Sequence, residues 1–481
     1  MSAAAISPFA PAHRLLAALR RREVSSLELT ELYLGRIERY NAELNAVVTL
    51  DAGAARETAR AADARRAQGQ DLPLLGLPIT IKDSIDVRGL PTTAGLPKRA
   101  GAVASQDAPV VARLRDAGAV ILGKTNVPPY TASWQTDNRL FGRSNNPWDL
   151  DRTPGGSTGG GAAAVAAGLS ALELGSDIGG SIRGPAAFCG IYGHRPSETA
   201  VPRSGQFPGS LLPNAASALN AVGPLARHAD DLILALDAIA GAEPGEDVAW
   251  RLELPPPRHG ALREFRVAVL PLPDWLPVSN AVASALEALV PLLEGLGARV
   301  ERAQPFDLRA HHRLYAAMLN VQFSFNRAEP EEKRLTRVAR MREDVDEFAN
   351  DYVRGLLASA QDLLQWHQQR EEYRAAYRDF FRHRDILLAP ISPVPAFRHD
   401  PEGGPVDVDG RLIPQEWLTI LAGVATLSGQ PATAFPAGRT GEDLPVGLQA
   451  IGPYLEDRTP IGFAALLAEE IGGFDAPPGY R

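Results

Sequence analysis

Hydrophobic positions recur at helical spacing early in the chain. Leu29, Tyr33 and Ile37 are four residues apart, so they lie on one face of a helix. Ser25 and Glu28 just before them have the spacing of a capping box, in which the two side chains satisfy the first free N–H groups of a helix. The pattern therefore predicts an amphipathic helix that begins at this box and buries one apolar face.

Further along, helix-length segments alternate with short apolar runs. The segment 51–70 is rich in alanine and arginine, which predicts a solvated surface helix. The remaining helices are expected at 109–117, 162–167, 278–296 and through most of 309–381, and the strands at 77–81, 119–122, 266–270, 298–300, 386–390 and 431–436. This alternation is typical of the α/β class. No internal repeat or long linker divides the chain, so we expect one large domain over residues 1–481.

Composition excludes several classes of protein. With 45% hydrophobic and 22% charged residues, the chain has enough apolar surface to fold, and its apolar runs are far shorter than the roughly 20 residues of a membrane span. The net charge of −8 gives no basic field for nucleic acid. The single cysteine, Cys189, excludes an intrachain disulfide and a cysteine-based zinc site. Residues 1–22 carry no export signal, so we expect the protein in the cytoplasm.

Lys82 is unusual because lysine is rare here and this one ends an apolar run. The chain has four lysines among its 49 basic residues. Burying an ammonium costs several kcal/mol unless it pairs or loses its proton. Either Lys82 pairs with Asp83 or Asp86, or it is a neutral lysine that acts as a base. Taken alone, the residue favours the ion pair.

Two glycine-rich segments each carry a serine. Ser157 lies in the sequence GGSTG, which matches the nucleophile elbow of α/β-hydrolases, but residues 146–154 before it read as loop where the elbow needs a strand. Ser181 follows the sequence DIGG, in which backbone N–H groups unshielded by side chains could stabilise a developing anion. Taken alone, each glycine segment is better explained as a tight turn.

A serine nucleophile needs a base. The chain has nine histidines, so a Ser-His-Asp triad is not excluded, but His194 is the only histidine in the glycine-rich regions. A lysine base, a relaying serine and a serine nucleophile would account for Lys82, Ser157 and Ser181 together.

The segments 76–83 (GLPITIKD), 155–160 (GGSTGG) and 175–183 (GSDIGGSIR) resemble the amidase signature family of serine amidohydrolases. The spacings agree with that family, with Ser157 75 residues after Lys82 and Ser181 24 residues after Ser157. The resemblance extends to residues 123–126, 146–148, 385–390 and 444–449, so it covers nearly the whole chain. It implies one twisted mixed β-sheet surrounded by helices, with a signature core at about 70–230 and 385–475 and a variable helical region at about 255–384.

The resemblance also implies residue roles. Ser181 would be the nucleophile, and Ser157, held by a cis peptide after Gly156, would relay its proton to the neutral base Lys82. The oxyanion hole would be formed by the backbone N–H groups of residues that follow one another in the chain, Ile178, Gly179, Gly180 and Ser181. Expected to contact the substrate are Trp134, Gln135, Gly155, Gly156 and Thr158. No metal or cofactor is implied.

The implied reaction is hydrolysis of a carboxylic amide, or of an anilide, carbamate (urethane) or ester, through an acyl-enzyme. The segment after Pro196 lacks the YGRVS pattern of the amidotransferase A subunit, which favours a stand-alone enzyme, monomer or homodimer, such as an aryl acylamidase or urethanase. Tyr130, Ala132, Trp134 and Phe207 favour an apolar or aromatic substrate over glutamine, although Trp134 is equally explained as core. The alternatives are a glutaminase A subunit of an amidotransferase complex and a catalytically silent binding protein on the same fold.

Overall fold

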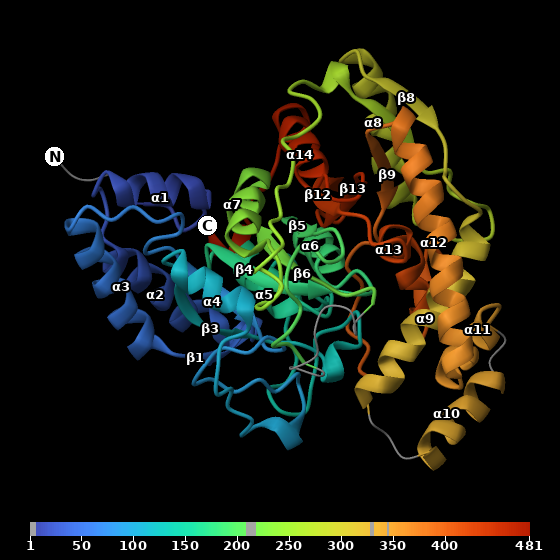
Figure 1. The fold of residues 1–481 in the computed structure, drawn as a ribbon, viewed down its shortest axis with the longest axis horizontal. Coiled ribbons are helices and arrows are strands. Elements are labelled where there is room, and N and C mark those ends of the chain that lie inside the picture. The colour runs from blue at the N-terminus through green and yellow to red at the C-terminus, as the bar shows by residue number, and fades with distance from the viewer. Residues whose placement is uncertain (1–5, 208–217, 328–330, 344–345) are drawn as a thin grey trace.

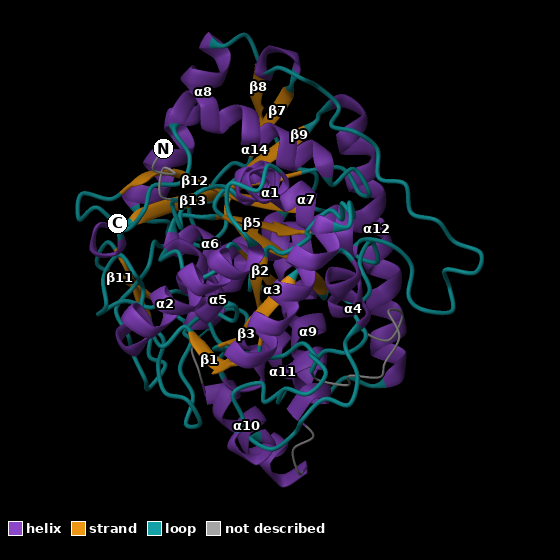
Figure 2. Ribbon diagram, turned by 90° about the vertical axis from the view of Figure 1, so that its left-hand side faces the viewer, coloured by secondary structure: helices purple, strands orange, loops and turns teal. Residues whose placement is uncertain are grey.

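A computed structural model describes residues 6–207, 218–327, 331–343 and 346–481. Within these ranges one eleven-stranded sheet runs through the molecule, with helices around it (Figures 1 and 2). Its strands, in spatial order, are β1 (Val47–Leu50), β3 (Val120–Thr125), β2 (Pro78–Lys82), β4 (Leu172–Asp177), β6 (Ala221–Ala226), β5 (Tyr192–Arg195), β12 (Ala432–Arg439), β13 (Pro445–Ile451), β9 (Ile386–Pro390), β7 (Arg266–Val269) and β8 (Arg299–Arg302).

The sheet is mixed. Neighbouring strands are parallel in the groups β3–β2–β4 and β9–β7–β8 and antiparallel elsewhere. A separate hairpin pairs β10 (Val406–Val408) with β11 (Arg411–Ile413). The α/β class with one mixed sheet surrounded by helices is thus confirmed. Because strands from residue 47 to residue 451 share this sheet, distant parts of the chain meet within it.

The helices cover the sheet and extend beyond one side of it. In Figure 1, α9 to α12 form a separate helical group on the side opposite α1 to α3. The α-helices are α1 (Ala12–Arg20), α2 (Ser26–Leu44), α3 (Ala52–Ala67), α4 (Pro109–Asp116), α5 (Gly159–Ala166), α6 (Arg183–Cys189), α7 (Ala229–Ile239), α8 (Asn280–Gly295), α9 (Leu308–Arg327), α10 (Glu331–Glu343), α11 (Ala349–Leu356), α12 (Ala360–His383), α13 (Thr419–Thr426) and α14 (Arg458–Ile471). None of the helices in the described ranges is long and apolar enough to cross a membrane.

The periodic segments form the elements that their patterns predict. The capping box of Ser25 and Glu28 starts α2, whose residues Leu29, Tyr33 and Ile37 are buried. One expected helix begins earlier than predicted, since α5 starts at Gly159 rather than at residue 162. Glycine permits this start because the helix packs closely there: a Cβ on Gly160 would lie 2.5 Å from the backbone nitrogen of Asn126.

The parallel pairing of β2 and β4 determines where the polar residues gather. Ile81 of β2 is in register with Leu174 of β4, so both strands end at the same edge of the sheet. Lys82 is the last residue of β2 and Asp177 the last of β4. The loop that carries Ser157 leads into α5, which packs against both strands.

Candidate active site

Lys82 is a fully buried lysine surrounded by hydroxyl and carbonyl oxygens. Its Nζ lies 2.8 Å from Ser157 Oγ, 3.1 Å from Ser176 Oγ and 3.2 Å from the Ser176 carbonyl oxygen. Burial lowers the pKa of Lys82 from about 10.5 to about 7, although the negative charges of Asp177 and Glu173 oppose this shift. A substantial fraction of this side chain is therefore neutral near neutral pH.

The ion pair that would have made Lys82 a structural residue is absent from the described part of the chain. Asp83 instead pairs with Lys124, whose Nζ lies 3.3 Å from its Oδ1, and accepts a hydrogen bond from Thr93 Oγ1. Among the described residues, Lys82 thus faces Ser157 with no carboxylate in direct contact.

The loop before α5 packs tightly enough to exclude side chains at its glycines. The peptide bond between Gly156 and Ser157 is cis, as the resemblance implies. A Cβ on Gly155, which has a φ of +86°, would lie 2.8 Å from Pro185 Cα, and a Cβ on Gly156 would lie 2.2 Å from the Ser133 carbonyl oxygen. No strand precedes Ser157, so the strand that a nucleophile elbow requires is missing from this described segment.

Ser181 lies at the end of a loop that Asp177 organises. The Asp177 carboxylate accepts hydrogen bonds from the backbone N–H groups of Gly180, at 3.0 Å, and Ile182, at 3.1 Å, and forms a buried ion pair with Arg183. The charge of Arg183 holds the pKa of Asp177 well below its usual range despite burial. The Thr158 N–H donates to the Ser181 carbonyl oxygen at 3.1 Å, which joins this loop to the Ser157 loop.

The backbone N–H groups of the loop differ in what they contact. Gly180 N–H is directed to Asp177, whereas those of Ile178, Gly179 and Ser181 have no acceptor in the described part of the chain. These three residues also line one pocket. They offer unpaired donors beside the Ser181 hydroxyl, which is the arrangement that stabilises a developing oxyanion.

This pocket, which we call the Ser181 pocket, has a volume of about 280 Å³. Besides the Ser181 loop, its walls come from the loop at 131–134, from α9, α10 and α11, and from residues 415–419, so seven of the seventeen lining residues belong to the helical region at 255–384. The lining residues besides the three above are Thr131, Ala132, Ser133, Trp134, Leu319, Asn320, Phe323, Arg337, Arg340, Met341, Tyr352, Gln415, Glu416 and Thr419.

The residues expected to contact the substrate differ in whether they line the Ser181 pocket. Trp134 lines the Ser181 pocket but is only 7% exposed and packs against Phe188, so it belongs to both core and pocket. Gln135 does not line it, because both ends of its amide bond the backbone of Asp400 at 2.8 Å. Thr158 is buried, and its hydroxyl donates to the Ser176 carbonyl oxygen that Lys82 also contacts. Gly155 and Gly156 belong to the tightly packed loop that carries Ser157.

Two of the aromatic residues expected in the pocket lie outside it. Tyr130 and Phe207 contact each other, with ring centroids 6.2 Å apart, and neither lines the Ser181 pocket. Of the segment 197–213 that contains Phe207, residues 208–213 lie outside the described residues. The histidine considered as a base also lies elsewhere, since the ring of His194 contacts Thr433 and Asp457.

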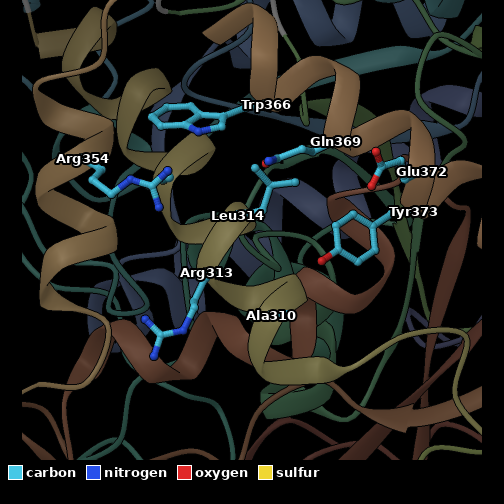
Figure 3. A pocket seen from close by; sticks show the side chains of 9 residues that line it. Ala310, Arg313, Leu314, Arg354, Trp366, Gln369, Glu372 and Tyr373 are labelled. Carbon is cyan, nitrogen blue, oxygen red and sulfur yellow. The ribbon is translucent and has the colours of Figure 1, made fainter. Parts of the chain in front are cut away.

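A second pocket, of about 310 Å³, lies between α9, α11 and α12 (Figure 3). It contains none of Lys82, Ser157 and Ser181. Its two arginines, Arg313 and Arg354, are both paired with Asp351, and Figure 3 shows Arg354 beside the indole of Trp366. Of the three candidate catalytic residues, Ser181 lines the Ser181 pocket.

Sequence reasoning missed two residues around Lys82. Ser176 supplies two of its three polar contacts. Glu173 of β4 is fully buried, accepts a hydrogen bond from Thr125 Oγ1 at 2.6 Å and leaves Oε2 without a partner in the described structure. Burial raises the pKa of Glu173 to about 7. The sequence carries no signal for Ser176 or Glu173, because a serine or a glutamate near glycines is also common at surface positions.

Glu173 leaves no room for a side chain at position 161, which is a glycine. A Cβ on Gly161 would lie 2.4 Å from Glu173 Oε1. We expect Gly161→Ser to lower the free energy of unfolding by about 1–3 kcal/mol, since an atom inserted into a packed interior must displace its neighbours. Urea denaturation measures the change.

Gly35→Ser is the matched control, because Gly35 is also helical and a Cβ there would meet no atom within 4 Å. The double variant Gly161→Ser/Glu173→Ala should lose less stability than the two single changes added together, as expected for residues in contact. Equal effects of Gly161→Ser and Gly35→Ser would contradict the steric explanation.

Comparison with known proteins relates this chain to amide-cleaving enzymes. A family model described as Amidase matches residues 28–460. The chain is 36% identical over 485 residues to the A subunit of glutamyl-tRNA(Gln) amidotransferase from Thermus thermophilus, an alignment that covers 95% of this chain and 96% of that protein. It is 34% identical over 454 residues to indoleacetamide hydrolase of Bradyrhizobium diazoefficiens, with 92% and 83% covered.

Among solved structures, a bacterial aryl acylamidase of the amidase signature family superimposes with a TM-score of 0.80 at 26% sequence identity, and the alignment covers 99% of this chain and all of that one. The sequence and structure comparisons thus both relate nearly the full length of this chain to the amidase family.

Proposed function

Because this chain belongs to the amidase family and is an amide-hydrolysing enzyme, we propose that it cleaves its substrate through a covalent acyl-enzyme on Ser181. One observation carries the proposal. Lys82 is buried, has a pKa of about 7 and lies 2.8 Å from Ser157 Oγ. The loop of Ser157 is hydrogen-bonded to Ser181, beside three N–H groups that have no acceptor among the described residues.

In the proposed first step, neutral Lys82 Nζ accepts the proton of Ser157 Oγ while Ser157 Oγ accepts the proton of Ser181 Oγ. Ser181 Oγ then attacks the amide carbonyl carbon, and the carbonyl electron pair moves onto oxygen. The N–H groups of Ile178, Gly179 and Ser181 stabilise that oxyanion. When the carbon–nitrogen bond breaks, the proton returns through Ser157 to the leaving amine. Water attacks the ester by the same route and releases the acid.

The intact set of Lys82, Ser157 and Ser181 favours catalysis over a silent binding role. We also propose a stand-alone enzyme, monomer or homodimer, in the cytoplasm, that works without tRNA, because the segment after Pro196 lacks the pattern of the amidotransferase A subunit. Its substrate is proposed to be a hydrophobic amide, anilide or aryl carbamate, since Trp134, Phe323 and Met341 line the Ser181 pocket.

One feature of the pocket favours a second candidate, the glutaminase component of an amidotransferase. Arg337, Arg340 and Glu416 also line the pocket, and such groups are partners of the kind that the charged ends of glutamine need. Similarity to the amidotransferase chain of Thermus thermophilus supports the same candidate.

Substrate preference separates the two candidates. We expect kcat/KM for an aryl amide to exceed that for free glutamine, because burial of an aromatic ring contributes to binding only where apolar side chains receive it. The measurement compares both substrates with the purified chain alone. A panel of anilides, fatty amides, primary amides and aryl carbamates then ranks the substrate classes. Clear preference for glutamine, or activity only with added partner chains, would favour the amidotransferase function instead.

A further inference from the structure

Tyr315 of α9 contacts the loop that carries Ser181 from outside the signature segments. Its hydroxyl donates a hydrogen bond to the Ile178 carbonyl oxygen at 2.9 Å, and the side chain is fully buried. Burial raises the pKa of Tyr315 well above its usual range, so the hydroxyl keeps its proton and remains a donor.

The contact bears directly on one of the unpaired N–H groups. The Ile178 carbonyl and the Gly179 N–H belong to the same peptide unit, which is planar and in which the two groups point in opposite directions when the bond is trans. Only Gly156–Ser157 is cis in the described chain, so this unit is trans. A donor fixed to the carbonyl oxygen therefore fixes the direction of Gly179 N–H, away from Tyr315.

The same hydrogen bond strengthens Gly179 as a donor. Hydrogen bonds in a chain polarise one another, so an amide whose oxygen accepts a bond donates more strongly through its N–H. Gly179 lines the Ser181 pocket, and its N–H has no acceptor in the described part of the chain.

Tyr315 is itself held in place. A Cβ on Gly423 of α13 would lie 2.6 Å from Tyr315 Cδ1, so the ring packs directly on that helix. Asp177 orients the loop through Gly180 and Ile182, while Tyr315 contacts the peptide unit that Asp177 does not reach.

We infer that Tyr315 is a positioning residue for the oxyanion hole, which orients and polarises the Gly179 N–H through the Ile178 carbonyl. The inference rests on the proposed acyl-enzyme function, and it connects the helical region at 255–384 to the rate of the chemical step.

The test is Tyr315→Phe with Tyr377→Phe as its matched control. Tyr377 is also fully buried, and its hydroxyl donates to the Val424 carbonyl oxygen at 2.8 Å, away from the Ser181 loop. We expect Tyr315→Phe to lower kcat about tenfold with little change in KM, less than the 10²–10³-fold loss on removing an oxyanion donor outright, since Gly179 N–H remains. Tyr377→Phe should lower the melting temperature by about as much as Tyr315→Phe does, but it should leave kcat unchanged.

Binding of an arylboronic acid gives a second readout. It forms a tetrahedral anionic adduct on a serine, so its affinity should fall by the same factor as kcat in Tyr315→Phe and stay constant in Tyr377→Phe. Incorporation of 3-fluorotyrosine at position 315 keeps a more acidic hydroxyl in place, so it should retain or raise kcat. This variant tests the inference if Tyr315→Phe does not fold.

Equal losses of kcat in Tyr315→Phe and Tyr377→Phe, an unchanged kcat in folded Tyr315→Phe, or a loss of kcat with 3-fluorotyrosine would overturn the inference and leave the proposed function intact. Failure of the wild-type chain to hydrolyse any amide or bind the boronic acid would instead count against the proposed function.

Discussion

Replacing Ser181 with alanine is expected to lower kcat/KM at least about 10⁴-fold, as loss of the nucleophile does in other serine hydrolases. The physical reason is that no other described hydroxyl lies at the end of the Ile178–Gly180 loop with unpaired N–H groups beside it. Steady-state kinetics on the best amide of the substrate panel measure the loss, and the variant should trap no acyl group.

Ser170→Ala is the control for this change. Ser170 is fully buried, and its hydroxyl donates to the Leu172 carbonyl oxygen at 2.7 Å, so the variant loses a buried hydroxyl at the other end of β4. It should retain wild-type kcat. A Ser181→Ala enzyme with more than a few per cent of the original activity would exclude Ser181 as the nucleophile.

Lys82→Arg is expected to lower kcat/KM at least about 10³-fold, within the range that general-base catalysis contributes. Arginine keeps a positive charge but cannot lose its proton in a protein, so it cannot accept the proton of Ser157. Lys82→Ala should be equally inactive. Full activity in the arginine variant would rule out Lys82 as the base.

The wild-type pH profile tests the same assignment without a substitution. Since Lys82 has a pKa of about 7, activity should fall as pH decreases through that value and the ammonium forms. The stability of the fold should change in the same direction. An unfolded lysine keeps its proton up to about pH 10.4, so between these two pKa values the unfolded state binds more protons and stability rises with pH. Lys82→Met should flatten this rise in urea denaturation.

The candidate catalytic residues could be located in the sequence because they lie in local patterns. The capping box at Ser25, the lysine that ends an apolar strand and the two serines in glycine-rich segments are all visible over fewer than ten residues each. The family resemblance then related Lys82 to Ser157 and Ser181, and the structure places Lys82 and Ser157 in hydrogen-bonding contact.

The remaining features depend on contacts between distant segments, which no local pattern encodes. The order of strands that joins β5 to β12 and β9 to β13 depends on packing of the whole sheet. Tyr315 reads as an ordinary core position of an amphipathic helix, and only the fold shows that its hydroxyl reaches the Ile178 carbonyl. Gln135 does not line the pocket, because the backbone of Asp400, 265 residues away in the chain, forms hydrogen bonds with both ends of its amide.

The most direct test of the account is to identify the serine that becomes acylated. The enzyme is treated with a sulfonyl fluoride or a slowly hydrolysed aryl carbamate, digested, and the modified peptide is sequenced by mass spectrometry. The account predicts one adduct per chain, on Ser181, and none in Ser181→Ala. An adduct on Ser157 would contradict it and would make Ser157 the nucleophile of the enzyme.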